Sequence, residues 1–223
     1  GDMMHVLFRR ITYLSCHKLE PDELHILYLG VVMYSLGSVL WLLTYKVLGG
    51  TPDENMTRVW AMITAAYSDL KTTSQFGTLM LKWFTDPSHH EEHYPKLKGK
   101  GGQVKHLVKP LHEVWKLLRS LGSAMHGRVT DMLDSLQRVV ELIDEHAHDA
   151  FMTIENANAL RDAIDVFLMT YSILTSDADK AGDLLWNMAP KFHWLWHLGH
   201  RALFLSPRRG ACWIDETFMK RMK

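Results

Sequence analysis

The sequence predicts a mostly α-helical fold, and three observations support this prediction. Residues 26–45 form a run of twenty amino acids without a formal charge, long enough for a helix of about 30 Å. Apolar residues after this run recur at helical spacing in several separate segments. No segment repeats at a fixed period, which makes a solenoid a poor model. We therefore expect a multi-helix domain built around one central apolar helix at 22–47.

The N-terminal part, residues 1–84, is expected to hold a strand and the central helices. Residues 4–16 are rich in β-branched and aromatic side chains, which favour a strand. The Pro-Asp-Glu segment at 21–23 is typical of a helix start, because proline suits the first turn and acids complement its positive end. Two further elements should follow: a helix at 51–71, opened by a second Pro-Asp-Glu segment, and a short helix or strand at 78–84.

The remainder divides into a loop and a second helical part. Residues 85–103 mix proline, glycine and charge, so we expect an exposed loop or linker. Residues 104–223 should form a helical domain that ends in a basic turn and helix. Its expected elements are helices at 104–121, with Pro110 as a kink or the true start, at 127–146, at 154–175 and at 181–204, the last containing Pro190, followed by a turn at 206–210 and a helix opened by Asp215 and Glu216.

The composition excludes some classes of function. Lysine and arginine total 25, as do aspartate and glutamate, so the formal net charge is zero. A global basic field that would gather nucleic acid is therefore absent from the sequence. The two cysteines, Cys16 and Cys212, cannot build a zinc framework. A reduced intracellular protein is the simplest interpretation, and the N-terminus lacks the pattern of a secretory signal.

A membrane span is the alternative to a core helix for residues 26–45. The run exceeds the threshold of about 18 apolar residues for a spanning helix, although serine, threonine, glycine and tyrosine dilute its hydrophobicity. A helix that is apolar all round lies either in lipid or in a large core. The amphipathic helices downstream need an apolar partner, so we favour the core helix and keep the single-span membrane anchor as the alternative.

The first group that can carry chemistry is Asp22 with His25. Their i, i+3 spacing places both side chains on one face of the central helix. An aspartate beside a histidine can hold Mg²⁺ or orient a partner. The competing interpretation is structural, because acids are favoured in first helical turns for electrostatic reasons alone.

The second group lies on the helix that follows Pro190. His193, His197 and His200 are spaced i, i+4, i+7 and share one helical face. Two histidines at i, i+4 make half of a zinc site, but no cysteine or acid completes it at the same spacing. The competing interpretation is a partly buried face whose imidazoles bond to carbonyls or carboxylates.

The third group is the turn at 206–210. Arg208 and Arg209 are adjacent, and adjacent arginines in a turn can contact phosphates. The last twenty-three residues carry a basic surplus despite the neutral total, which is the only local indication of nucleic-acid contact. The competing interpretation is an exposed turn followed by a helix N-cap.

Two segments resemble transposases of the CACTA and Plavaka type. PDELHILYLGV, residues 21–31, resembles their Asp-x-x-His-x-Leu-x-Leu-Gly segment, and PKFHWLWHL, residues 190–198, resembles their Pro-Lys-x-His-x-x-x-His-Leu segment. CWIDETFMKR, residues 212–221, matches the turn and acidic helix start that come next in that family. The whole chain is also similar to mobile-element-like open reading frames of dinoflagellates.

The resemblance implies an RNase H-like core that is interrupted by a helical insertion. This chain would contain the insertion and a remnant of the core. Asp22 and Glu216 would be the second and third catalytic acids and would hold Mg²⁺ or Mn²⁺ for attack on a phosphodiester. His193 and His197 would support the metal site or a DNA phosphate. Beside this resemblance, His25 is a further candidate metal ligand, and Lys191, Arg208 and Arg209 are the candidate DNA contacts. Such a protein would be intracellular and nuclear. The first acid of the family has no counterpart at the expected place, so we expect a piece of a longer parent, inactive alone.

Three functions therefore compete. A transposase-derived segment should bring Asp22 and Glu216 to within about 4–6 Å of each other. A non-enzymatic helical subunit of a homo-oligomer or larger assembly should instead expose an apolar patch larger than is usual for monomers. A membrane-anchored protein should turn residues 26–45 outward in a continuous belt.

Overall fold

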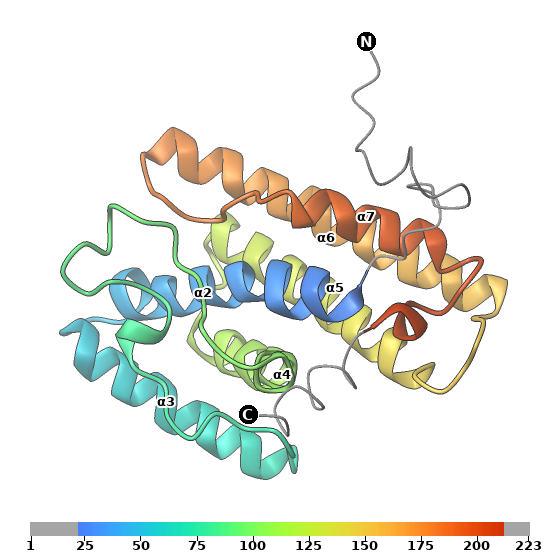
Figure 1. The fold of residues 1–223 in the computed structure, drawn as a ribbon. Coiled ribbons are helices and arrows are strands. Elements are labelled where there is room, and N and C mark those ends of the chain that lie inside the picture. The colour runs from blue at the N-terminus through green and yellow to red at the C-terminus, as the bar shows by residue number, and fades with distance from the viewer. Residues whose placement is uncertain (1–21, 212–223) are drawn as a thin grey trace, which may run out of the picture.

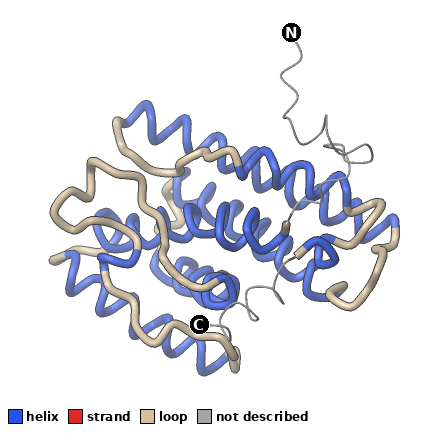
Figure 2. The backbone as a smooth tube through the Cα atoms, in the orientation of Figure 1, coloured by secondary structure: helices blue, strands red, loops and turns tan. Residues whose placement is uncertain are grey.

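The computed structural model describes residues 22–211. The strand expected at 4–16 and the helix expected at Asp215 lie outside these residues. Within 22–211 the chain is mostly helical and has no strand, which confirms the predicted class (Figure 2). The elements are η2 (Leu24–Val32), α2 (Met33–Leu42), η3 (Leu43–Val47), α3 (Pro52–Asp69), η4 (Leu81–Trp83), α4 (Gly101–Leu118), α5 (Ala124–Glu145), α6 (Ile154–Ala181), α7 (Lys191–Arg201) and η5 (Pro207–Gly210).

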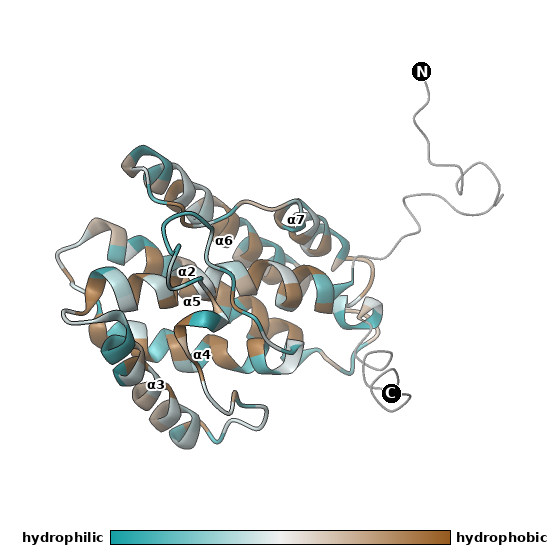
Figure 3. Ribbon diagram, turned by 60° about the vertical axis from the view of Figure 1, so that its left-hand side comes forward, coloured by the Kyte–Doolittle hydropathy of each residue, from teal (hydrophilic) through white to brown (hydrophobic). Residues whose placement is uncertain are grey.

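The first three elements form one continuous helix, Leu24–Val47, which we call the central helix. Its first and last turns are π-helical and its middle is α-helical. Figure 1 shows it in blue, with α6 and α7 on one side and α3 and α4 on the other. Leucine and valine side chains on all sides of it are fully buried. The surrounding helices carry both polar and apolar positions, as the alternating colours in Figure 3 show.

The polar residues that dilute the apolar run form hydrogen bonds inside the core. The Ser35 hydroxyl donates to the Val31 carbonyl at 3.0 Å, and the Thr44 hydroxyl donates to Leu40 at 2.9 Å. The central helix is long and apolar enough to cross a membrane, and 89% of its most apolar window is buried under the rest of the chain. Length and composition do not separate a core helix from a membrane span, whereas burial by neighbouring helices is the property expected of a core helix.

Local sequence signals explain where the other helices begin and end. Thr51 and Glu54 form a reciprocal capping box at the start of α3. Gly182, with φ of 75°, ends α6 in the left-handed conformation that favours glycine. α4 begins at Gly101 and continues across Pro110, so this proline does not mark its start.

The helix predicted at 181–204 is wrong in its N-terminal half. α7 begins after Pro190, because a proline has no N–H to donate and is best accommodated at a helix start. Residues 182–189 form a loop instead. The Trp186 N–H donates to the Ser38 hydroxyl at 3.1 Å, and the Thr175 hydroxyl donates to the Trp186 carbonyl at 2.8 Å. These contacts fix the loop on the central helix and α6.

The segment at 85–100 contains no helix and lies against the central helix. The Leu97 N–H donates to the Met33 carbonyl at 2.9 Å, and the Leu97 side chain is fully buried. Gly37 permits this approach, because a Cβ there would lie 3.0 Å from the backbone of Lys96 and Leu97. Around these anchors most side chains of the segment are exposed.

Candidate functional site at the start of the central helix

The two segments that carry the transposase resemblance lie side by side. The Lys191 ammonium donates to the Leu29 carbonyl at 3.0 Å. Leu29 departs from helical geometry, with φ of −88° and ψ of 15°, inside the wide first turns of the central helix. A Cβ on Gly30 would lie 2.5 Å from the Lys191 side chain. The glycine therefore makes room for the lysine that joins α7 to the central helix.

Asp22 and His25 form the pair that their spacing predicts. The Leu24 N–H donates to Asp22 Oδ1 at 3.0 Å, and His25 Nδ1 lies 2.5 Å from Asp22 Oδ2. The Asp22 side chain is 28% exposed and that of His25 54% exposed. Asp22 therefore stabilises the first helical turn, as the structural interpretation expects.

Lys191 is electrostatically linked to this pair. Partial burial lowers the pKa of Lys191, and the positive charge of Lys96 lowers it further. The negative charge of Asp22 acts in the opposite direction and raises this pKa. Because its ammonium already donates to the Leu29 carbonyl, Lys191 has a structural role besides the predicted contact with DNA.

Beside Asp22 lies a partly buried polar group that we call the Glu23 cluster, made of Glu23, Tyr28, Lys105, Asp144 and Arg208. Arg208 Nη1 lies 3.2 and 3.3 Å from the two oxygens of Glu23, whose side chain is fully buried. Burial raises the pKa of Tyr28 well above its ordinary value, and the Glu23 carboxylate raises it further. Lys105 pairs with Asp144 and lies 5.7 Å from the centre of the Tyr28 ring.

The Glu23 cluster gives the two predicted DNA-contacting arginines different surroundings. Arg208 is 26% exposed and is bound to Glu23, whereas Arg209 is exposed. The cluster also joins the start of the central helix to η5, close to the C-terminal end of the described residues (Figure 1). Glu23 was not predicted as a site residue, because an acid in a first turn is normally exposed and nothing local signals a partner 185 residues away.

The predicted histidine face is present on the outer side of α7. His193 Nε2 and His197 Nε2 lie 3.0 Å apart. Desolvation lowers the pKa of His197, and the neighbouring His193, His200 and Arg201 lower it further. His200 does not complete a metal site, because the described residues contain no group of three or more histidine, cysteine, aspartate or glutamate side chains placed to hold an ion. Its ring packs against Trp196, with the ring centres 4.0 Å apart.

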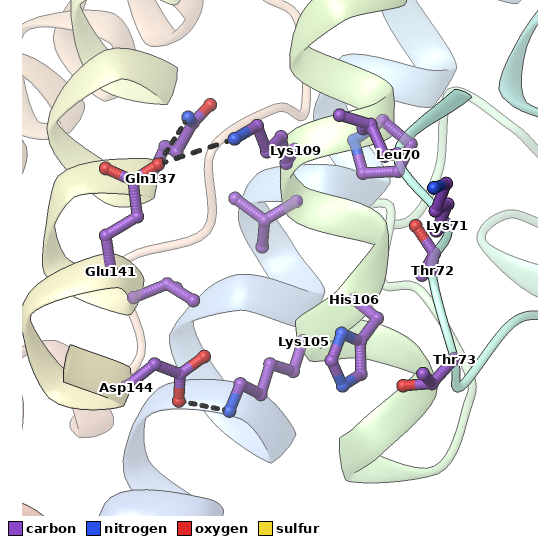
Figure 4. Close-up of a pocket in the computed structure, with 13 residues that line it drawn as sticks. Leu70, Lys71, Thr72, Thr73, Lys105, His106, Lys109, Gln137, Glu141 and Asp144 are labelled. Atoms are coloured by element: carbon purple, nitrogen blue, oxygen red, sulfur yellow. Dashed lines mark hydrogen bonds and ion pairs between the residues drawn. The ribbon is translucent and has the colours of Figure 1, made fainter. Parts of the chain in front are cut away.

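A cleft between α4, α5 and the end of α3 has a volume of about 370 Å³ (Figure 4). Ion pairs cross it: Lys105 pairs with Asp144, and Lys109 Nζ lies 3.9 Å from Glu141 Oε1. The i, i+4 spacing places both lysines on one face of α4, and the i, i+3 spacing places both acids on one face of α5. These spacings could have predicted the two charged faces from the sequence. The ion pairs across the cleft join α4 to α5. Because these acids neutralise both lysines, the cleft is a weak candidate for binding an anion.

Of the two predicted catalytic acids, the described residues contain only Asp22. Glu216 and its neighbour Asp215 lie outside them, so their separation from Asp22 stays a prediction. Comparison with protein-family models, curated proteins and solved structures finds no match to this chain. The transposase resemblance therefore rests on the sequence segments alone, and the RNase H-like core remains part of a proposal.

Proposed function

We propose that this chain is a transposase-derived segment that contributes to DNA binding and metal-dependent phosphoryl transfer within a longer, nuclear parent protein. The observation that carries the proposal is the contact between Glu23 and Arg208. It places the residue after Asp22 against a turn that precedes Glu216 by eight residues. Eight extended residues span at most about 28 Å, so the length of chain after Arg208 permits Glu216 to approach Asp22.

The residues of the site have distinct roles in this proposal. Asp22 and Glu216 supply the carboxylate oxygens that Mg²⁺ and Mn²⁺ prefer. A bound divalent ion stabilises the charge that develops on a phosphate during in-line displacement. His25, 2.5 Å from Asp22, orients the carboxylate. Arg209, whose side chain is exposed, and Lys191 are the candidate phosphate contacts.

A calorimetric titration with Mn²⁺ tests the proposal. We expect the wild-type chain to bind Mn²⁺, and both Asp22→Asn and Glu216→Gln to weaken binding at least about tenfold, because each removes a charged ligand. Asp53→Asn is the matched control, since Asp53 is an exposed acid in the first turn of α3. The proposal fails if the wild type binds no Mn²⁺, or if the Asp22 and Glu216 variants bind it as tightly as the control.

A non-enzymatic interaction module is the second candidate, and one observation favours it. Apolar side chains are exposed on α6 and α7, including Met169 at 62%, Ile173 at 42% and Trp194 at 45%. Exposed apolar residues that gather on one face are typical of contact surfaces. A homo-oligomer or larger assembly would cover them. Concentration-dependent association that Met169→Lys abolishes, combined with absent Mn²⁺ binding, would favour this function over the first.

A further inference from the structure

The outer face of α7 holds two imidazoles whose Nε2 atoms lie 3.0 Å apart. His193 and His197 are one helical turn apart, their ring centres are 4.6 Å apart, and their planes cross at 84°. The opposite face of α7 is firmly packed: Phe192 and Leu195 are buried, and a Cβ on Gly199 would lie 3.0 Å from the Ile164 side chain. The two imidazoles therefore stand on a rigid support.

We infer that His193 and His197 form a chelating site for one transition-metal ion of the Ni²⁺, Cu²⁺ and Zn²⁺ class. Imidazole nitrogen is a preferred ligand of these ions, whereas Mg²⁺ prefers oxygen. The site is thus distinct from the acids proposed to hold Mg²⁺ or Mn²⁺. Neither Asp22 nor His25 belongs with the histidine pair in a common group of ligands among the described residues.

The separation of the nitrogens fits such an ion. The two Nε2 atoms are 3.0 Å apart. Two nitrogens at this separation, each about 2.0–2.1 Å from an ion, subtend roughly 91–97° at the metal. That is the angle between neighbouring positions in the square-planar and octahedral geometries of Cu²⁺ and Ni²⁺. Tetrahedral Zn²⁺ requires about 3.3–3.4 Å between the nitrogens, which a small side-chain rotation supplies.

Without a metal, the same distance is explained by one neutral imidazole donating its Nε2–H to the other ring. When an ion binds, the donating ring takes the tautomer that carries its proton on Nδ1, so that both Nε2 lone pairs face the metal. Metal binding needs both rings in the neutral form. Water completes the coordination shell around the two protein ligands, so the site stays open to exchange. Binding therefore weakens as the pH falls and the imidazoles become protonated.

The surrounding indoles provide a local reporter. The Trp196 ring centre lies 5.0 Å from that of His197, and the Trp194 centre lies 5.6 Å away. Bound Cu²⁺ or Ni²⁺ quenches the fluorescence of indoles at such short range. Other histidines also lie near tryptophans, such as His126 beside Trp115. Only quenching that is lost in His193 and His197 variants therefore places the ion on this face of the protein, independently of the heat of binding.

The experiment is a Ni²⁺ titration of the full chain at pH 7.5, followed by calorimetry and tryptophan fluorescence. We expect a quenching site in the wild type that weakens at least about tenfold in His193→Ala and in His197→Ala, because each variant loses one of two ligands. His200→Ala is the matched control, because it removes an imidazole from the same helix but not from the pair. Circular dichroism verifies that each variant is folded.

Two further comparisons separate this site from other histidines and from the proposed function. The double variant His193→Ala, His197→Ala measures background binding by histidines elsewhere in the chain, and Asp22→Asn must leave the Ni²⁺ site unchanged. Absence of Mn²⁺ binding by the wild-type chain, with Ni²⁺ binding intact, would overturn the proposed function alone. Wild-type quenching no stronger than in the double variant, or equal loss in His200→Ala, would overturn the chelating site.

Discussion

The Glu23 cluster and the histidine face of α7 both gather ionisable side chains, but in opposite environments. Glu23 is fully buried and bound by Arg208, which lies at the other end of the described chain. His193 is exposed, and its partner His197 is one turn away on the same helix. A buried charge depends on its partner, because removing that partner leaves an uncompensated charge. An exposed imidazole can exchange its hydrogen bond for a ligand at little cost to the fold.

The largest effect on stability is expected when the buried contact between Glu23 and Arg208 is removed. Arg208→Ala should lower the free energy of unfolding by about 3 kcal/mol, because it leaves the Glu23 carboxylate without that cation. Its neighbour Arg209 is exposed, so Arg209→Ala should change stability by less than about 0.5 kcal/mol, as should His193→Ala. Urea denaturation measures all three.

A double variant sharpens the same test. Adding Glu23→Gln to Arg208→Ala should recover part of the lost stability, because a buried amide costs less than a buried carboxylate. Equal stability of Arg208→Ala and Arg209→Ala would show that the contact between Arg208 and Glu23 does not hold the cluster together.

Two helical glycines differ in the same way, because Gly37 is closely packed against another segment and Gly127 is not. Gly37→Ala should destabilise the protein by about 1–3 kcal/mol, because its Cβ would press on the backbone of residues 96 and 97. Gly127→Ala should stabilise it by up to about 1 kcal/mol, since no atom approaches within 4 Å and alanine favours helix. Thermal denaturation measures both, and the same sign for the two variants would contradict the packing of the 85–100 segment on the central helix.

The smallest effect concerns a buried histidine, for comparison with the exposed pair. The His112 side chain is 1% exposed, with Nδ1 2.8 Å from Gln137 Oε1 and Nε2 3.1 Å from Asp134. Burial lowers the pKa of His112, and Lys116 lowers it further, although Gln137 and the nearby acids oppose this shift. The unfolded chain therefore binds a proton at a higher pH than the folded one. Stability from this group is present above the ordinary pKa and is lost as the pH falls through the lowered value.

Chemical denaturation between pH 7.5 and 5 measures this contribution. The difference in unfolding free energy between wild type and His112→Gln should shrink as the pH falls from 7.5 to 5. An unchanged difference across this range would mean that His112 is not held neutral by burial. His193→Ala provides the comparison at an exposed site on α7.

The sequence predicted much of the helical framework from local signals. The amphipathic spacing located α3, α4, α5 and α6, and α3 begins at the second Pro-Asp-Glu segment as expected, where Thr51 and Glu54 form a capping box. Local signals work here because each acts over a few residues and needs no other part of the chain. The error at residues 182–190 came from extending a helix through Pro190, where the Trp186 loop is held by Ser38 and Thr175.

In the candidate site, too, local contacts were predictable from the sequence and long-range contacts were not. The i, i+3 spacing of Asp22 and His25 and the i, i+4 spacing of His193 and His197 were readable directly, and both pairs are in contact. The need for a small residue at Gly30 was not readable, because the lysine that passes over it lies 161 positions further along the chain. The same is true of the contact between Glu23 and Arg208.

The sequence by itself thus determined which segments are helical and which neighbouring side chains share a helical face, because backbone hydrogen bonding and residue spacing are local. Only the tertiary structure decided which acid is buried and which glycine lies against another segment. It also decided that the central helix is enclosed by protein. These properties depend on contacts between residues far apart in the chain, and such contacts form only when the apolar faces of several helices pack together.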